Sequence, residues 1–159
     1  MPELFCQACE KPITISTQAW KLHSSAFPQV CGPYCFLKWA GQGTAKSVQK
    51  YPINKGMLSL AGDVWSQRLG LFFRSKYEVD VAEFMNRNGV RWLYEPSTFP
   101  VINATYTPDF YLTDHDSFVE VKGGWGGSSK TKYRRFIAEY PDVRILLLPW
   151  SLNEEFKDE

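Results

Sequence analysis

All four cysteines of this chain lie within its first 35 residues. They form two close pairs, Cys6-x-x-Cys9 and Cys31-x-x-x-Cys35, with 21 residues between the pairs. Two such pairs suit a tetrahedral zinc ion, which takes four thiolates from two short loops. A segment of about 35 residues cannot bury a sufficient core alone, so a bound metal would supply much of its folding free energy. We therefore predict a structural zinc site at Cys6, Cys9, Cys31 and Cys35.

Two disulfides or four unligated thiols are the alternative interpretations of this cysteine pattern. Disulfides are rare in reducing compartments, and the N-terminal Met-Pro-Glu lacks the basic and apolar regions of a secretory signal. The spacing resembles that of short zinc ribbons and treble-clef fingers, so we expect a zinc-finger unit over residues 1–40. With four cysteine ligands the zinc has no position left for water or substrate, and its role would be structural.

The rest of the composition is that of an ordinary folded protein. Of the 159 residues, 44% are hydrophobic and 22% are charged, which excludes a disordered chain, and no apolar run approaches the ~20 residues that span a bilayer. We therefore expect a soluble protein of the cytoplasm, without a membrane partner. The net charge is only +1, but the segment 122–135 contains five basic residues and no acidic one. Such a patch suits a polyanionic partner and is equally typical of a solvated surface.

Residues 41–71 are polar and contain several glycines, with weak periodicity. They are predicted to be a linker with one short helix near residues 63–69. Three lysines in this stretch, Lys46, Lys50 and Lys55, would allow the linker to follow a phosphate backbone. An uninvolved tether is the equal alternative.

A second unit is predicted over residues 72–150, followed by an acidic tail at 151–159. Ser75 and Glu78 have the spacing of a capping box, and the apolar residues after them recur at helical intervals up to Asn88-Gly89. Stretches rich in β-branched and aromatic residues predict strands. The predicted order is a helix at 76–88, strands at 90–94, 105–112 and 118–122, a helix at 130–140 and an interior strand at 143–148. This order predicts an α/β (α+β) domain in which helices flank a mixed sheet.

Four ionisable residues fall close together on this predicted frame. Asp109 lies in the first arm of an expected hairpin, and Glu120 and Lys122 lie on one face of the second arm, because strand residues two apart point the same way. A pair of carboxylates with open positions suits a hard cation such as Mg²⁺. A neighbouring lysine would serve an attacking water or neutralise charge on phosphorus. Glu78 would reach the same site as a further ligand, or would serve only as a helix cap.

Several runs of this sequence match one known pattern. Pro108-Asp109 followed by Glu120-Val121-Lys122 resembles the signature of the PD-(D/E)xK nuclease superfamily, which implies a restriction-endonuclease-like core. A longer match, over about residues 72–148, resembles the bacteriophage endonuclease I family of Holliday-junction resolvases. The runs that carry it are Arg74-Ser75-x-x-Glu78, Tyr94-Glu95-Pro96, Tyr106-Thr107-Pro108-Asp109-Phe110, Phe118-Val119-Glu120-Val121-Lys122-Gly123 and Trp125.

This resemblance implies a metal-dependent phosphodiesterase that cuts DNA, with Mg²⁺ or Mn²⁺ as the catalytic ion. By residue, Asp109 and Glu120 would be metal ligands and Glu78 would complete the metal site. Lys122 would position or activate the attacking water. Lys132 falls where that family has a basic residue, and it would hold a phosphate.

DNA contacts are expected on the segment that follows the predicted hairpin. The basic stretch would grip the phosphate backbone, which contributes affinity but no sequence information. Trp125 would stack on an exposed base or sugar, or would pack in the core. The residues expected to contact DNA are Trp125, Lys130, Lys132, Arg134 and Arg135.

We expect the substrate to be branched or distorted DNA, such as a Holliday junction. A second copy of the chain is a candidate partner, because the resolvases that the sequence resembles act as strand-exchanged pairs. One alternative is the same chemistry with sequence specificity, as in homing, restriction or mismatch-nicking enzymes. A second alternative is a non-catalytic, zinc-containing DNA-binding module. If the chain is viral, the expected cytoplasm is that of the host cell.

Overall fold

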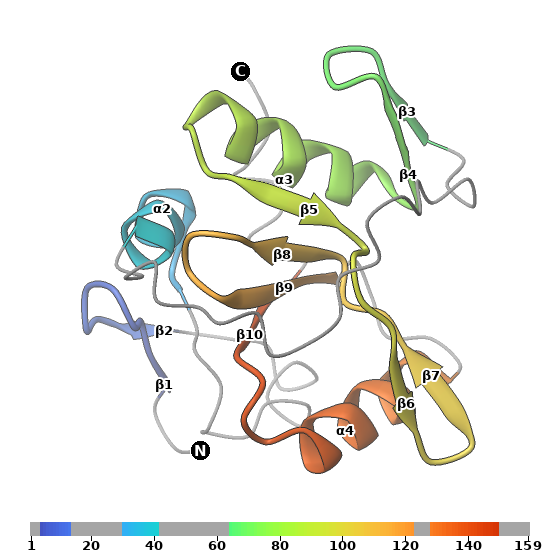
Figure 1. The fold of residues 1–159 in the computed structure, drawn as a ribbon. Helices are drawn as coiled ribbons and strands as arrows, with labels where there is room; N and C mark the ends of the chain where they lie inside the picture. Colours follow the sequence, from blue (N-terminus) through green and yellow to red (C-terminus); the bar gives the residue numbers. More distant parts are fainter. Residues whose placement is uncertain (1–3, 14–29, 42–63, 123–127, 150–159) are drawn as a thin grey trace.

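The computed structural model describes residues 4–13, 30–41, 64–122 and 128–149 (Figure 1). The centre of the molecule is a four-stranded mixed sheet with the strand order β10-β9-β8-β5. β10 and β9 are parallel, whereas the β9–β8 and β8–β5 pairs are antiparallel. The strands of this sheet are β5 (Trp92–Tyr94), β8 (Phe110–Leu112), β9 (Ser117–Lys122) and β10 (Ile145–Pro149). The predicted mixed sheet is therefore confirmed.

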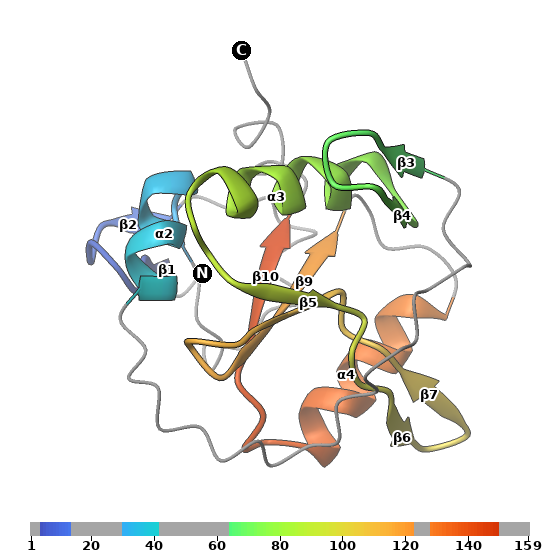
Figure 2. The same ribbon diagram turned by 45° about the horizontal axis from the view of Figure 1, so that its top comes forward.

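Helices cover both faces of the central sheet, as Figure 2 shows for α3 and α4. α3 (Lys76–Arg87) and α2 (Pro33–Gly41) pack on one face, and α4 (Ser129–Glu139) packs on the other. Side chains alternate along β10, so that Leu146 joins the core under α3 and Ile145 joins the core under α4. β10 has both faces covered, as its apolar sequence predicts. In the described part of the chain, however, it is an outer strand rather than the interior strand that was predicted.

The helix predicted at 76–88 is confirmed as α3, which begins directly after the N-cap Ser75. The Oγ of Ser75 accepts a hydrogen bond of 3.2 Å from the Glu78 N–H, as expected of a capping box. The chain turns away from the helix at Gly89, whose φ of +70° is a conformation that favours glycine. The helix predicted at 130–140 is confirmed as α4. Among the described residues, no helix has the length and apolar character needed to cross a membrane.

The strand predicted over 105–112 is wrong, because this stretch contains two strands that belong to different sheets. β7 (Ala104–Tyr106) pairs with β6 (Phe99–Val101) in a separate hairpin, whereas β8 belongs to the central sheet. Pro108 lies at the break, where it has no N–H to donate to a neighbouring strand. Asn103 makes the tight turn between β6 and β7 with a φ of +55°. The predicted hairpin survives in a shorter form, as β8 and β9.

The short helix predicted near residues 63–69 is also wrong. β3 (Val64–Ser66) and β4 (Leu71–Phe73) form an antiparallel hairpin in its place. Each run is too short to show a periodicity of its own, and the pairing between the two runs decides the structure. Most of the predicted linker, residues 42–63, lies outside the described residues, as does the acidic tail predicted at 151–159.

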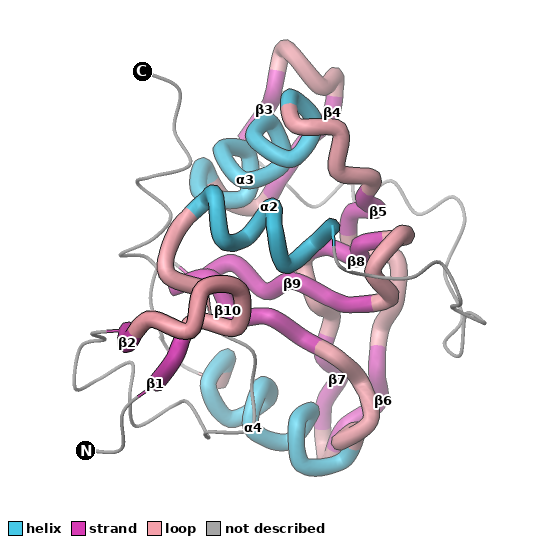
Figure 3. The backbone as a smooth tube through the Cα atoms, turned by 90° about the vertical axis from the view of Figure 1, so that its left-hand side faces the viewer, coloured by secondary structure: helices cyan, strands magenta, loops and turns pink. Residues whose placement is uncertain are grey.

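The N-terminal segment packs onto the central sheet. β1 (Leu4–Phe5) and β2 (Pro12–Ile13) form a two-stranded hairpin, and α2 begins at Pro33, where a missing N–H costs no hydrogen bond. The Trp39 ring of α2 lies on the His115 ring in the β8–β9 turn, with 4.0 Å between the ring centroids. Figure 3 shows α2 beside α3 over the strands of the sheet. Buried residues of this segment therefore share one core with α3, β8 and β9.

We expect this shared core to make the molecule unfold as one unit. Phe36 of α2 is fully buried in the core, whereas Tyr34 on the same helix is 78% exposed. Phe36→Ala should lower the free energy of unfolding by roughly 3–5 kcal/mol, because it leaves a large cavity, and Tyr34→Ala should change it little. Circular dichroism and tryptophan fluorescence should report one coincident thermal transition for all three proteins. A separate transition at lower temperature in Phe36→Ala, with the sheet unaffected, would show that the N-terminal segment unfolds independently of the central sheet.

Candidate active site and metal centre

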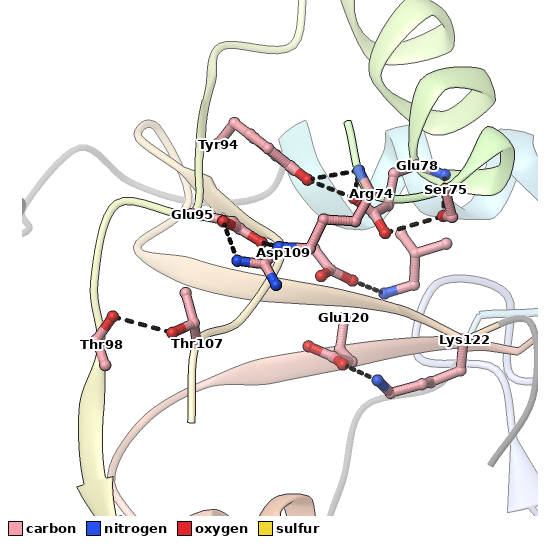
Figure 4. A network of polar contacts seen from close by, with 11 residues as sticks. Arg74, Ser75, Glu78, Tyr94, Glu95, Thr98, Thr107, Asp109, Glu120 and Lys122 are labelled. Atoms are coloured by element: carbon pink, nitrogen blue, oxygen red, sulfur yellow. Dashed lines mark hydrogen bonds and ion pairs between the residues drawn. The ribbon is translucent and has the colours of Figure 1, made fainter. Parts of the chain in front are cut away.

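The hairpin of β8 and β9 brings Asp109 beside Glu120. The two strands are antiparallel with Phe110 opposite Val119, so Asp109, which directly precedes β8, lies beside the end of β9. The Oδ2 of Asp109 accepts a hydrogen bond of 2.7 Å from the Val121 N–H. This bond fixes the carboxylate at the end of the central sheet (Figure 4).

Lys122 and Glu120 lie on the same face of β9, as strand alternation predicts. The Nζ of Lys122 forms an ion pair with Oε1 of Glu120. The other carboxylate oxygen, Oε2 of Glu120, is buried and has no hydrogen-bond partner among the described residues. The pKa of Tyr106 is raised first by burial and then by the neighbouring Glu120. The Tyr106 hydroxyl therefore faces this carboxylate, but it does not reach hydrogen-bond geometry with it.

Glu78, in the first turn of α3, is held by several hydrogen bonds at this end of the sheet (Figure 4). Its Oε2 accepts one of 2.6 Å from the Tyr94 hydroxyl and one of 3.2 Å from the Arg74 N–H. Its Oε1 accepts one of 2.8 Å from the Ser75 hydroxyl. The Arg74 guanidinium in turn forms a two-pronged ion pair with Glu95, at 2.6 and 3.3 Å. The carboxylate of Glu78 therefore has a set orientation in addition to its place in the helix cap.

The site carries more buried negative than positive charge. Burial raises the pKa of Asp109, and the charges of Glu120 and Glu78 raise it further. Burial also raises the pKa of Glu120 and of Glu78, against opposing contributions from Lys122 in the first case and from Tyr94 in the second. Burial alone would lower the pKa of Lys122, but the Glu120 carboxylate raises it, so the lysine is charged at neutral pH. Three buried carboxylates thus face one ammonium group.

The residues at this end of the sheet fit a divalent metal ion. Carboxylate oxygens are the ligands that Mg²⁺ and Mn²⁺ prefer, and the Oε2 of Glu120 is an acceptor that the described residues leave unused. Within the described ranges, only the four cysteines are gathered tightly enough to surround an ion with side-chain atoms alone. Water and substrate oxygens would therefore complete the coordination at the carboxylates.

Glu95 connects Arg74 to the backbone of Asp109, a role that the sequence pattern does not indicate. In the sequence, Glu95 is only a member of the Tyr94-Glu95-Pro96 run that carries part of the family resemblance. Its side chain holds Arg74, and its N–H donates a hydrogen bond of 2.8 Å to the Asp109 carbonyl. The residue has a φ of +44°, which is unusual for a side chain of this kind. No local pattern marks such a role, because it depends on the pairing of β5 with β8.

The basic residues predicted to contact DNA lie mostly on α4. Those in the described structure are Lys130, Lys132, Arg134 and Arg135. Arg135 donates a hydrogen bond of 2.6 Å to the carbonyl of Ile102 in the β6–β7 turn, so one of its guanidinium N–H donors is already used within the protein. Tyr133 on the same helix has a pKa raised by burial and then by Glu120, which places one face of α4 near the carboxylates. Trp125 lies outside the described residues, and its role stays a prediction.

The four cysteines converge as predicted. Cys6 and Cys9 lie between β1 and β2, Cys35 lies in the first turn of α2, and Cys31 lies two residues before that helix begins. The four sulfur atoms lie within 4.8 Å of one another, and all four cysteines are free, which does not support the disulfide interpretation. Burial raises the pKa of Cys6, but the backbone N–H groups around it, that of Ala8 first, lower it to about 7. The Cys6 thiol therefore readily becomes a thiolate, whereas burial raises the pKa of Cys31 and of Cys35, whose protons a zinc ion would have to displace.

An 80-residue stretch of the chain is 34% identical to Endonuclease I of Escherichia phage T7. The alignment of 80 positions covers 48% of this chain and 53% of that protein, so the chain spans about half the length of the relative that it matches. The chain matches no family model and no solved structure. The partial match supports a relationship between this chain and a phage endonuclease, in agreement with the motifs seen in the sequence.

Asp109→Asn should raise the free energy of unfolding by about 1–3 kcal/mol when no divalent cation is added and no chelator is present. The amide still offers an oxygen to the Val121 N–H, and it removes a buried charge. Because the pKa of Asp109 is raised in the folded state, the wild type loses stability as the pH rises from the ordinary aspartate value through the raised one. Asp109→Asn does not lose stability in this pH range. The difference in free energy of unfolding between the variant and the wild type should therefore be larger at about pH 8 than at about pH 5.

The matched control is Asp114→Asn in the turn of the same hairpin. The Asp114 side chain reaches solvent, and its pKa is lowered by the hydrogen bond and the charge of Arg91. Its replacement should therefore lower the stability slightly or leave it unchanged. Thermal denaturation over a pH series measures both variants. An equal gain in stability in Asp109→Asn and Asp114→Asn would show that removal of the buried Asp109 charge is not its cause.

The cysteine cluster should hold about one zinc ion per chain in the purified protein. Elemental analysis measures the metal, and a thiol reagent should modify the four cysteines only after a chelator removes it. Cys6 and Cys35 belong to the shared core, so removal of zinc should lower the melting temperature of the whole chain. A folded protein with no zinc and four reactive thiols would contradict the assignment.

Proposed function

We propose that the chain is a DNA endonuclease that hydrolyses phosphodiester bonds with the help of a divalent metal ion. The observation that carries this proposal is the meeting of Asp109, Glu120 and Lys122 at one buried end of the β8–β9 hairpin. The likeness to a phage endonuclease over 80 residues supports it. The order and types of these three residues also agree with the PD-(D/E)xK signature that the sequence resembles.

Each residue of the site has a distinct task in this proposal. Asp109, Glu120 and Glu78 would hold Mg²⁺ or Mn²⁺, which would supply charge neutralisation at the phosphate and a water of lowered pKa. The Val121 N–H keeps the Asp109 carboxylate in place. Lys122 lies beside Glu120, with which it forms an ion pair, so it would position the attacking water or neutralise charge on a phosphate oxygen.

The hydrogen bonds around Glu78 would hold its carboxylate in the orientation in which it binds the metal ion. The Tyr94 and Ser75 hydroxyls each donate to one of its carboxylate oxygens, which limits the rotation of the side chain. A ligand that is already oriented loses less conformational entropy when a metal binds. Arg74, held by Glu95, fixes the end of β4 against the same carboxylate.

The DNA backbone would contact the basic side chains of α4. Lys132, Lys130 and Arg134 would bind phosphates, and Trp125 would stack on an exposed base or sugar. We propose branched or distorted DNA as the substrate and a second copy of this chain as a partner in its symmetric cleavage. The zinc unit would have a structural role, and the protein would act in the cytoplasm, that of the host cell if the chain is viral.

The proposed chemistry is tested by Glu120→Gln and Lys122→Met in the full chain. Each should reduce Mg²⁺-dependent cleavage roughly 100- to 1,000-fold, because Glu120→Gln weakens the metal site and Lys122→Met removes the ammonium group that acts at the water or the phosphate. Asp114→Asn, at the far end of the same hairpin, is the control and should cleave like the wild type. Gel assays on a four-way junction, a flap, a nicked duplex and a linear duplex measure the rates. Full activity in both site variants would overturn the assignment.

The same panel of substrates decides between the two kinds of specificity. A preference for the junction or the flap over the linear duplex is expected. Cleavage of one linear sequence at a defined position, without such a preference, would favour the sequence-specific alternative. A wild type that binds DNA but cuts none of the substrates would favour the non-catalytic alternative.

A further inference from the structure

The β3–β4 hairpin exposes two large aromatic side chains. Trp65 and Phe72 are cross-strand partners, and they remain 52% and 45% exposed. Their ring centroids are 4.8 Å apart, and the ring planes are inclined by 54°. The rings therefore do not cover each other face to face, and ring surface stays available to a third flat group. Phe73, the next residue, is fully buried, so the outward position of Phe72 follows from strand alternation.

The exposed pair is held in place by buried anchors. The Ser66 hydroxyl donates a hydrogen bond of 2.8 Å to Glu83 of α3. The Phe73 ring packs on the Tyr94 ring, with 4.7 Å between the centroids. Gly70, with a φ of +65°, allows the turn of the hairpin. The two exposed rings are thus presented by a fixed element rather than by a loose one.

The hairpin lies next to the carboxylate site. Phe72 precedes Arg74 by two residues, about 7 Å along an extended chain. The Arg74 N–H contacts both Glu78 and the Tyr94 hydroxyl. In Figure 1 the β3–β4 hairpin and the β6–β7 hairpin project above and below the same end of the central sheet. Figure 3 shows β3 and β4 beyond α3 at one extremity of the molecule.

Cations face solvent around this hairpin, with their counter-ions behind them. Arg68 pairs with Glu83, Arg74 with Glu95 and Lys76 with Asp80. In each pair the basic side chain is more than half exposed and the carboxylate is largely buried. The outer surface therefore presents positive groups beside the two rings, which suits an anionic partner that also carries flat apolar groups.

We propose that Trp65 and Phe72 stack on unpaired nucleobases of the DNA strand that enters the carboxylate site. This inference rests on the proposed endonuclease function. Aromatic side chains beside cationic groups are the usual means of binding single-stranded nucleic acid, because every base has a π face. In a fully paired duplex the neighbouring base pairs cover these faces. The hairpin therefore selects flaps, gaps and branch points over continuous duplex.

A second copy of the chain is a poorer fit to this surface. Two aromatic side chains would bury roughly 300–500 Å² at most. A stable interface buries about 800 Å² per partner. The rings are also bordered by charged groups rather than by further apolar surface.

The test is DNA binding by the full chain, without added divalent cation and without chelator, so that the zinc site stays intact and the DNA is not cut. The probes are a duplex with a three-nucleotide flap, with 2-aminopurine beside the branch point, and a fully paired duplex of the same sequence. Trp65→Ala and Phe72→Ala should each weaken flap binding about tenfold, as expected for one lost stacking contact. Both should change duplex binding by less than about twofold and should abolish the 2-aminopurine signal change.

Two further variants separate stacking from general damage. Trp65→Phe keeps an aromatic face and should retain most of the flap affinity. Ile102→Ala removes a 61% exposed apolar side chain in the β6–β7 turn and should bind both probes like the wild type. Equal losses on both probes, no loss on either, or a change of oligomeric state in sedimentation would overturn the stacking proposal.

The outcome also distinguishes this proposal from the endonuclease proposal. A wild type that binds the flap through Trp65 and Phe72, but does not cut it when Mg²⁺ is added, would overturn only the catalytic assignment. A wild type that cuts the flap, with alanine variants that bind and cut equally well, would overturn only the stacking role.

Discussion

The antiparallel register of β8 and β9 brings the carboxylates of Asp109 and Glu120 together. Phe110 pairs with Val119, and the Asp109 carboxylate accepts the Val121 N–H at the point where the regular ladder ends. This register places Asp109 next to Glu120. A shift of one residue would turn Glu120 and Lys122 to the opposite face of the sheet and would leave Asp109 without its partner.

The buried carboxylates of the site destabilise the fold, and the two apolar cores on either side of the sheet offset this effect. Three carboxylates with raised pKa values lie at the end of the sheet, and among the described residues the largely buried positive charge beside them is that of Lys122. Burial of charge without full pairing is destabilising. It persists because apolar side chains on both faces of β9 and β10 hold the strands in place. Such a conflict between local chemistry and stability is typical of functional sites.

The cysteine unit supports the opposite end of the same hairpin. Trp39 packs on His115 in the β8–β9 turn, and the Nδ1 of His115 lies 2.8 Å from the Ser117 hydroxyl. Burial lowers the pKa of His115 to about 4, so the ring is neutral at ordinary pH and packs as an aromatic group. The segment that carries the four cysteines therefore packs against an element whose far end carries Asp109. In the described structure it is part of the same core and does not stand apart from it.

Short stretches of the sequence were enough to predict most of the local elements and the types of reactive residue. Cysteine spacing, the Ser75 cap and the Glu120-x-Lys122 alternation are short-range patterns, and the structure agrees with each of them. The break at Pro108 and the β3–β4 hairpin were missed, because both depend on which strand pairs with which. The support of Glu78 by Tyr94 and the link from Glu95 to Asp109 were decided only by tertiary structure. These contacts join residues that are 14 to 16 positions apart in the chain, and no local periodicity encodes a contact made by the packing of separate elements.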